Sequence, residues 1–168
     1  MNEPIVNKVA ESALVTIDLE SYLPKENPQV VDLKEYLFMG LILKEKEFRE
    51  MLKSTDWEQF RNKEVVVTCT ADAIIPVWAY MLVASSLKQV TNLISLESLS
   101  QWKSRKLLEN IRKMDLAQFA EKRVVIKGCG DEPIPDEAYL EVTSVLLPVV
   151  KTIMYGEPCS TVPVYKKK

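Results

Sequence analysis

The chain has 168 residues, of which 47% are hydrophobic and 27% are charged. This balance is typical of a globular protein and excludes a disordered chain. The formal net charge of −2 provides no overall field that would attract nucleic acid or an anionic membrane, so neither is expected as a partner. Histidine is absent, which excludes Ser–His and Cys–His nucleophile pairs and imidazole metal ligands.

Three further features indicate the compartment. The three cysteines are an odd, low number that does not fit a secreted disulfide framework. No secretory signal pattern opens the sequence. The most apolar stretch, residues 73–84, is too short to span a bilayer and contains Pro76. We therefore expect a cytoplasmic protein.

The first elements are predicted as a strand followed by a helix. "ALVTIDL", residues 13–19, is expected to form an edge strand, and residues 24–28 to form a loop. Apolar residues spaced three or four positions apart predict a helix over residues 32–53. Its inward side chains would be Leu33, Leu37, Leu41, Phe48 and Leu52.

Two short β-branched runs, "EVVVTC" at 64–69 and "RVVIKGC" at 123–129, predict buried strands. A helix is expected after each run, starting near Pro76 and Pro135, because proline suits the first turn of a helix. The other elements expected are a weaker strand at 90–96, a helix at 96–114, continuation of the last helix to Ile153, and an ordered tail without helix or strand period at 155–168.

The two buried runs belong to an internal repeat. Residues 56–87 and 115–146 align without a gap and are identical at 14 of 32 positions. Self-similarity at a fixed offset usually reports a reused supersecondary unit. We interpret the repeat as a duplicated βα unit within one domain.

The alternation of strands and helices predicts the fold class. We expect residues 1–168 to form a single α/β domain of three layers, with a mostly parallel sheet that contains the duplicated unit. If the strand order reverses after residues 90–96, the strands around Val66 and Val125 become neighbours, and a ligand crevice lies at their carboxyl ends.

Several segments resemble a known family. "TCTADAIIPVWAYML", "RVVIKGCGDEPIP" and "IMYGEPCSTVPVYK" are similar to an uncharacterised bacterial family, domain of unknown function 2480. The stretches "TIDLE" and "GLILKEKEFR" resemble it as well, so the likeness covers nearly the whole chain. It implies an intracellular bacterial protein and supplies neither a reaction nor site residues.

The cysteines provide the candidate site. All three lie in turn-like sequence, at strand ends or among Gly and Pro, rather than inside apolar runs. Three thiolates could hold zinc, iron or copper, and an aspartate or water could complete the site. Lys127 or Lys151 could offset the negative charge. The candidate metal ligands are Cys69, Cys129, Cys159, Asp72 and Asp131.

Three alternatives to a metal site stay open. The cysteines could do redox or nucleophilic work, or they could be inert residues of a non-catalytic interaction or scaffold protein. Asp72 and Asp131 could simply cap helices. No reaction follows from the sequence, and the partner is either a small molecule or a protein, with a homodimer as one arrangement.

Nucleotide binding is not expected. "GCG" at 128–130 follows a predicted strand and precedes a helix, but Pro133 stands where the dinucleotide fingerprint needs a small residue. A phosphate loop of the Gly-Lys-Ser/Thr type is absent.

Overall fold

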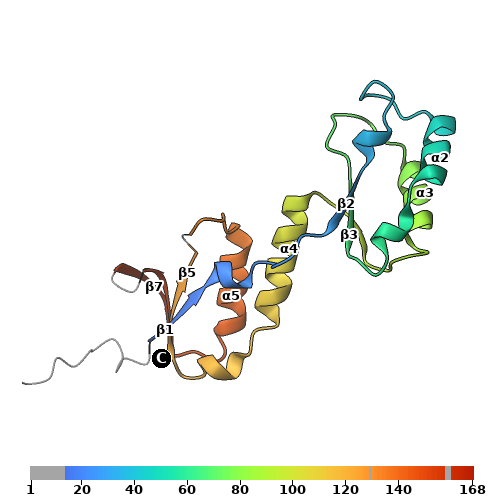
Figure 1. Ribbon diagram of the computed structural model, residues 1–168. Coiled ribbons are helices and arrows are strands. Elements are labelled where there is room, and N and C mark those ends of the chain that lie inside the picture. Colours follow the sequence, from blue (N-terminus) through green and yellow to red (C-terminus); the bar gives the residue numbers. More distant parts are fainter. Residues whose placement is uncertain (1–13, 129, 158–159) are drawn as a thin grey trace, which may run out of the picture. The chain divides into compact units, whose positions relative to one another are not determined.

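The computed structural model describes residues 14–128, 130–157 and 160–168. This part of the chain contains four α-helices and seven strands (Figure 1). The strands are β1 (Leu14–Asp18), β2 (Gln29–Asp32), β3 (Val65–Thr68), β4 (Ile94–Leu96), β5 (Arg123–Lys127), β6 (Thr152–Glu157) and β7 (Ser160–Lys166), and the α-helices are α2 (Glu45–Ser54), α3 (Val77–Leu87), α4 (Leu99–Arg112) and α5 (Asp136–Leu146). Four short 3₁₀ helices are η1 (Leu19–Tyr22), η2 (Leu33–Tyr36), η3 (Trp57–Phe60) and η4 (Leu116–Phe119).

The chain divides into two compact units. Unit 2 comprises Lys25–Trp102, and unit 1 comprises the chain on either side of it, up to Pro24 and from Lys103 onward. Each unit has its own sheet and its own buried cluster. Unit 2 is therefore inserted into unit 1 after η1.

The two sheets share one arrangement. In unit 2 the order is β2-β3-β4, with both pairs parallel. In unit 1 the order is β1-β5-β6-β7, with two parallel pairs and an antiparallel β6–β7 pair. The first three strands of unit 1 thus correspond in order and direction to the three strands of unit 2.

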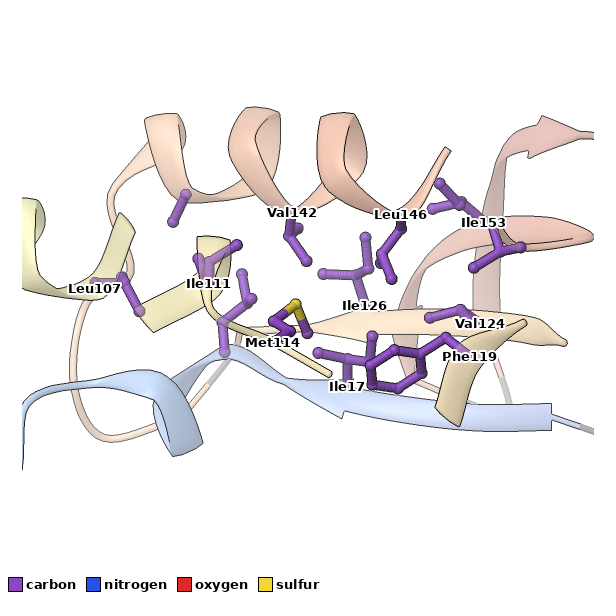
Figure 2. Close-up of a cluster of buried hydrophobic side chains, with 13 residues drawn as sticks. Ile17, Leu107, Ile111, Met114, Phe119, Val124, Ile126, Val142, Leu146 and Ile153 are labelled. Carbon is purple, nitrogen blue, oxygen red and sulfur yellow. The ribbon is translucent and has the colours of Figure 1, made fainter. Parts of the chain in front are cut away.

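In each unit, two helices pack against the central strand of the sheet. In unit 1, side chains of α4 and α5 meet alternate residues of β5, such as Val124 and Ile126 (Figure 2). In unit 2, side chains of α2 and α3 meet Val65 and Val67 of β3. Phe48 of α2 is fully buried there. The β-branched central strands explain why each unit forms a core around a short sheet.

The duplication predicted from the sequence is confirmed, element by element. Residues 56–87 form η3, β3 and α3, and residues 115–146 form η4, β5 and α5 at an offset of 59. The repeated aspartates at the start of each copy cap the 3₁₀ helices: Asp56 accepts a hydrogen bond from Glu58 N–H and Asp115 from Ala117 N–H, both 3.1 Å. The α/β class and the mostly parallel strands are confirmed as well.

The structure extends the repeat to the first strand of each unit. β1 and η1 read "TIDLESYL" at 16–23, and β2 and η2 read "VVDLKEYL" at 30–37. Asp18 accepts a hydrogen bond from Glu20 N–H at 3.1 Å, and Asp32 accepts one from Lys34 N–H at 3.0 Å. Each unit is therefore a full copy of a strand, a 3₁₀ helix, an α-helix, a second 3₁₀ helix, and a βαβ crossover.

Three expectations about the fold were wrong. The strands around Val66 and Val125 are not neighbours, because β3 lies between β2 and β4, whereas β5 lies between β1 and β6. The helix expected over 32–53 begins only at Glu45; β2 and η2 precede it, and Met39 (φ 53°) and Gly40 (φ 71°) adopt left-handed conformations that a helix excludes. The last helix ends at Leu146, and the segment that follows forms the β6–β7 hairpin.

None of the helices in the described residues has the length and apolar character needed to cross a membrane.

Candidate functional site

The three-cysteine site stays a prediction. Cys69 follows β3 in unit 2, whereas Cys129 and Cys159 lie outside the described residues. The proposed crevice between Cys69 and Cys129 depended on β3 and β5 being neighbours in one sheet, and they lie in different sheets. Across residues 14–128, 130–157 and 160–168, no cluster of three or more Cys, Asp or Glu side chains could hold a metal ion.

Cys69 has a local structural role. Its side chain is partly buried against the core of unit 2, and its thiol lies 3.6 Å from the Ala71 carbonyl oxygen. Burial, and secondarily the charge of a Cys69 thiolate, raise the pKa of Tyr80. Cys69 therefore packs close to α3.

Asp72 and Asp131 lie in exposed loops between a strand and a helix. The N-cap positions of α3 and α5 are occupied by Pro76 and Pro135, so the interpretation of these aspartates as helix caps was wrong. Proline at the start of each helix agrees with the sequence prediction.

In unit 2 a different aspartate lies at the carboxyl ends of the strands. Asp32, the last residue of β2, accepts hydrogen bonds from the Thr70 hydroxyl at 2.5 Å and from the Thr70 N–H at 3.0 Å. Burial alone would raise the pKa of the Asp32 carboxyl group. The two hydrogen bonds from Thr70, a third from Lys34 N–H and the positive charge of Lys34 together outweigh burial and lower this pKa. Asp32 thereby fixes the loop after β3.

In unit 1 the corresponding ends of the strands carry ion pairs. Lys127, the last residue of β5, lies with Nζ 3.7 Å from Oε1 of Glu157 and 4.0 Å from Oδ2 of Asp18. These three residues end β5, β6 and β1, which are neighbours in the sheet. Nearby, Glu20 accepts a hydrogen bond from Glu132 N–H at 3.0 Å. The predicted role of Lys127 beside a thiolate site stays a prediction; in the described residues its partners are the carboxylates of Glu157 and Asp18.

Each unit has an apolar groove beside its sheet. The groove of unit 2 lies between α3 and the β4 side of its sheet and has a volume of about 630 Å³. The groove of unit 1 lies between α5 and the β6–β7 side of its sheet and has a volume of about 660 Å³. Both volumes are within the range of sites that hold small ligands or peptide side chains.

The duplication has preserved the construction of these grooves. Six lining positions in unit 2 correspond to six in unit 1 at the repeat offset of 59. The pairs are Val67 and Ile126, Tyr80 and Tyr139, Met81 and Leu140, Ala84 and Thr143, Ser85 and Ser144, and Leu96 and Tyr155.

The two grooves differ at the edge of the sheet. In unit 1, β7 pairs antiparallel with β6, and its Val162 and Val164 line the groove. In unit 2, β4 ends the described sheet order and no strand occupies the corresponding position there. Apolar side chains are accordingly open to solvent: Leu96 is 62% exposed and Met81 is 67% exposed. Within the described residues, unit 2 thus presents an apolar groove beside a strand edge that no other strand pairs with.

The grooves were not predicted from the sequence, and Tyr80 and Tyr139 are among the residues that line them. Both side chains are only partly buried, and Tyr139 packs edge-on against Tyr155 with 5.6 Å between ring centroids. The available signal was the identity of Tyr80 with Tyr139 and of Ser85 with Ser144, which lie on the same helix faces in the two copies.

Comparisons with known proteins agree with the sequence resemblance. Neither the curated proteins nor the solved structures contain a match. Residues 3–167 match the family described as "Protein of unknown function (DUF2480)". The match spans nearly all of the 168 residues, and the chain therefore belongs to this family.

Proposed function

We propose that this chain is a non-catalytic protein-interaction module that binds an extended polypeptide segment along the free edge of β4. The observation that supports the proposal is the internal comparison of the two units. Unit 1 carries an antiparallel strand, β7, beside a groove of the same construction. Unit 2 has the groove, and no described strand pairs with β4 on that side. Adding a strand to an exposed sheet edge is a common mode of peptide recognition.

The backbone of β4 is suited to this pairing. Its bonds to β3 use alternate residues: Val65 N–H donates to the Leu93 carbonyl at 2.8 Å, and Glu97 N–H donates to the Val67 carbonyl at 3.2 Å. Because successive residues of a strand direct their amides to opposite sides, the N–H and C=O groups of Ile94 and Leu96 point away from β3. They form the row of groups that an added strand would satisfy.

The groove supplies side-chain specificity. In unit 1, β7 places two valines, spaced two residues apart, against α5 and β6. A ligand for unit 2 needs the same pattern, with two apolar side chains on one face of an extended segment. Main-chain hydrogen bonds would give affinity, and these two side chains would select the sequence.

The proposal is tested with a probe peptide of sequence "STVPVYK", which is β7 itself, blocked at both ends. Titrating it into the isotope-labelled full chain should shift the amide resonances of Ile94 and Leu96 and the methyl resonance of Met81. A peptide with aspartate at both valine positions is the matched control and should leave these signals unchanged. In the monomeric chain, shifts confined to β6, or none at all, would refute a binding edge on β4.

Two variants locate the binding surface. Leu96→Lys puts a charge on the β4 edge and should abolish the peptide-induced shifts, because charges on edge strands oppose pairing. Val30→Lys makes the same change on β2, at the opposite edge of the same sheet, where Val30 is 45% exposed. This control should bind as the unchanged chain does. Equal loss of binding in both variants would contradict the proposed location.

A second proposal retains the thiol or metal site, with Cys129 and Cys159 as its cysteines. Supporting it, Lys127 and Glu157, which lie within two residues of these cysteines, end neighbouring strands and form an ion pair at 3.7 Å. Cys69 belongs to the other unit and is not required. Zinc, or another transition metal that binds thiolates, is the group such a site would take.

Metal content and thiol reactivity test this second proposal. The reduced full chain should retain metal, and Cys129→Ser and Cys159→Ser should each remove it, whereas Cys69→Ser should not. If the chain is free of metal, the two thiols should react faster than Cys69 with an alkylating reagent at neutral pH. Uniform slow reaction of a metal-free chain would end the proposal.

A further inference from the structure

We infer that the strand that pairs with β4 is β4 of a second copy of the chain, so that two copies form a two-fold symmetric dimer with a continuous sheet across unit 2. The inference rests on the proposed function and names the partner of its binding edge. Two-fold interfaces are self-complementary, since each copy contributes the same surface. An antiparallel pair of identical strands meets this requirement directly.

The sequence of β4 has the pattern that the groove accepts. In unit 1, β7 contributes Val162 and Val164, two apolar residues at a spacing of two, to the groove. In β4 the residues at that spacing are Ile94 and Leu96. They are in register with Val65 and Val67 of β3, which belong to the buried cluster on the groove face. β4 of a second copy would thus bring two apolar side chains to the groove.

One register satisfies both the backbone and the side chains. With the two-fold axis at Ser95, Ile94 of one copy lies opposite Leu96 of the other. Both residues direct their backbone groups outward, so the two opposed pairs form four N–H···O=C bonds across the axis. The three paired residues are Ile, Ser and Leu, and no charges are brought into opposition.

Edge strands are commonly protected from pairing by short length, proline, lysine or a bulge, and β4 is short, with three residues, but has none of the other three features. β7 contains Pro163 and Lys166, and its pairing with β6 shifts register between Ile153 and Met154. Beside β4, Met81 of α3 is 67% exposed and would be covered by the second copy.

The first test is the mass of the full chain as a function of concentration, by sedimentation equilibrium. We expect a monomer–dimer equilibrium. Leu96→Lys should shift it to monomer, whereas Val30→Lys on the opposite edge should leave it unchanged. Circular dichroism and a urea melt of each variant show whether it is folded. A folded Leu96→Lys variant that still dimerises as the unchanged chain does would overturn the inference.

The second test traps the register. In the proposed dimer the two Ser95 residues face each other across a non-hydrogen-bonded pair, with Cα atoms about 4.5 Å apart, a distance that a disulfide can bridge. Ser95→Cys should therefore give a covalent dimer under mild oxidation, with the link between positions 95 identified by mass spectrometry. Asn92→Cys is the matched control, because its two copies would lie six residues apart along the pair, roughly 20 Å. Dimers without a link at position 95 would overturn the inference.

The two tests separate this inference from the proposed function. A chain that stays monomeric at every concentration but binds the "STVPVYK" peptide at β4 refutes the dimer and leaves the interaction module standing. A monomeric chain that does not bind the peptide refutes both. A dimer that the peptide dissociates supports both, since the two compete for one edge.

Discussion

Asn62 and Glu121 occupy equivalent positions in the two units, and both adopt the left-handed conformation, with φ angles of 57° and 54°. The Asn62 N–H donates to the carbonyl of Val90, shortly before β4, at 3.0 Å. The Glu121 N–H donates to the carbonyl of Val149, shortly before β6, at 2.8 Å. The turn that enters the central strand has therefore been duplicated together with its unusual backbone.

This shared turn gives a prediction about stability. Asparagine tolerates the left-handed conformation, whereas glutamate does so at a cost of about 1 kcal/mol. Glu121→Gly should therefore raise the free energy of unfolding by up to about 1 kcal/mol, and Asn62→Gly should change it less. Urea denaturation of both variants measures the difference. Glu121→Gly also removes the exposed ion pair between Glu121 and Lys167. Glu121→Gln removes that pair and keeps the backbone cost, so a Glu121→Gly variant less stable than Glu121→Gln would contradict the expected strain.

A second prediction concerns Gly128, which follows β5. A Cβ at this position would lie 2.1 Å from Oη of Tyr139 and 2.8 Å from its Cζ, so the tyrosine would have to move. Gly128→Ala should destabilise the chain by about 1–3 kcal/mol. Combining it with Tyr139→Phe, which removes the nearest atom, should recover part of the loss in a double-mutant cycle measured by urea denaturation. Strict additivity of the two changes would contradict the close approach.

A third prediction concerns acid stability. Because the pKa of Asp32 is lowered in the folded chain, its carboxylate stabilises the fold above the ordinary pKa of 3.8, and this contribution is lost as the pH falls through the folded value. Thr70→Val removes the hydroxyl donor and should cost about 1 kcal/mol at pH 7. The difference from the unchanged chain should shrink below pH 3.8.

Urea denaturation at pH 7 and at successively lower pH measures this difference. Thr16→Val, at an exposed position of β1, is the control and should change the free energy of unfolding by less than about 0.5 kcal/mol at either pH. A Thr70→Val effect of equal size at all pH values would show that Asp32 is not its origin.

The sequence predicted the repeat because the elements between Asp56 and Leu87 are rigidly specified by local patterns. A β-branched strand and a helix that begins after proline can be identified without tertiary contacts. The pairing of strands could not be predicted in this way. β3 and β5 have similar sequences, and only long-range packing decides whether two such strands lie in one sheet or in two separate sheets.

Short elements account for the other differences. β2 has only four residues, too few for a strand pattern to be recognised. The helix expected over 32–53 failed because Met39 and Gly40 interrupt its pattern. The tail was expected to be ordered but without strand structure, because Gly156 and Pro163 disrupt the period-two pattern of the β6–β7 hairpin. The grooves are properties of packed surfaces, and no single motif marks them.

The most direct measurement of the central claim, that β4 is a binding edge, is amide hydrogen exchange of Ile94 and Leu96. Their counterparts in unit 1, Ile153 and Tyr155, pair with β7 and should be protected under all conditions. In dilute protein Ile94 and Leu96 should exchange rapidly. With saturating "STVPVYK" peptide, or at high protein concentration, they should slow by about tenfold or more, equivalent to at least about 1.4 kcal/mol. Rapid exchange of both amides under every condition would contradict the claim.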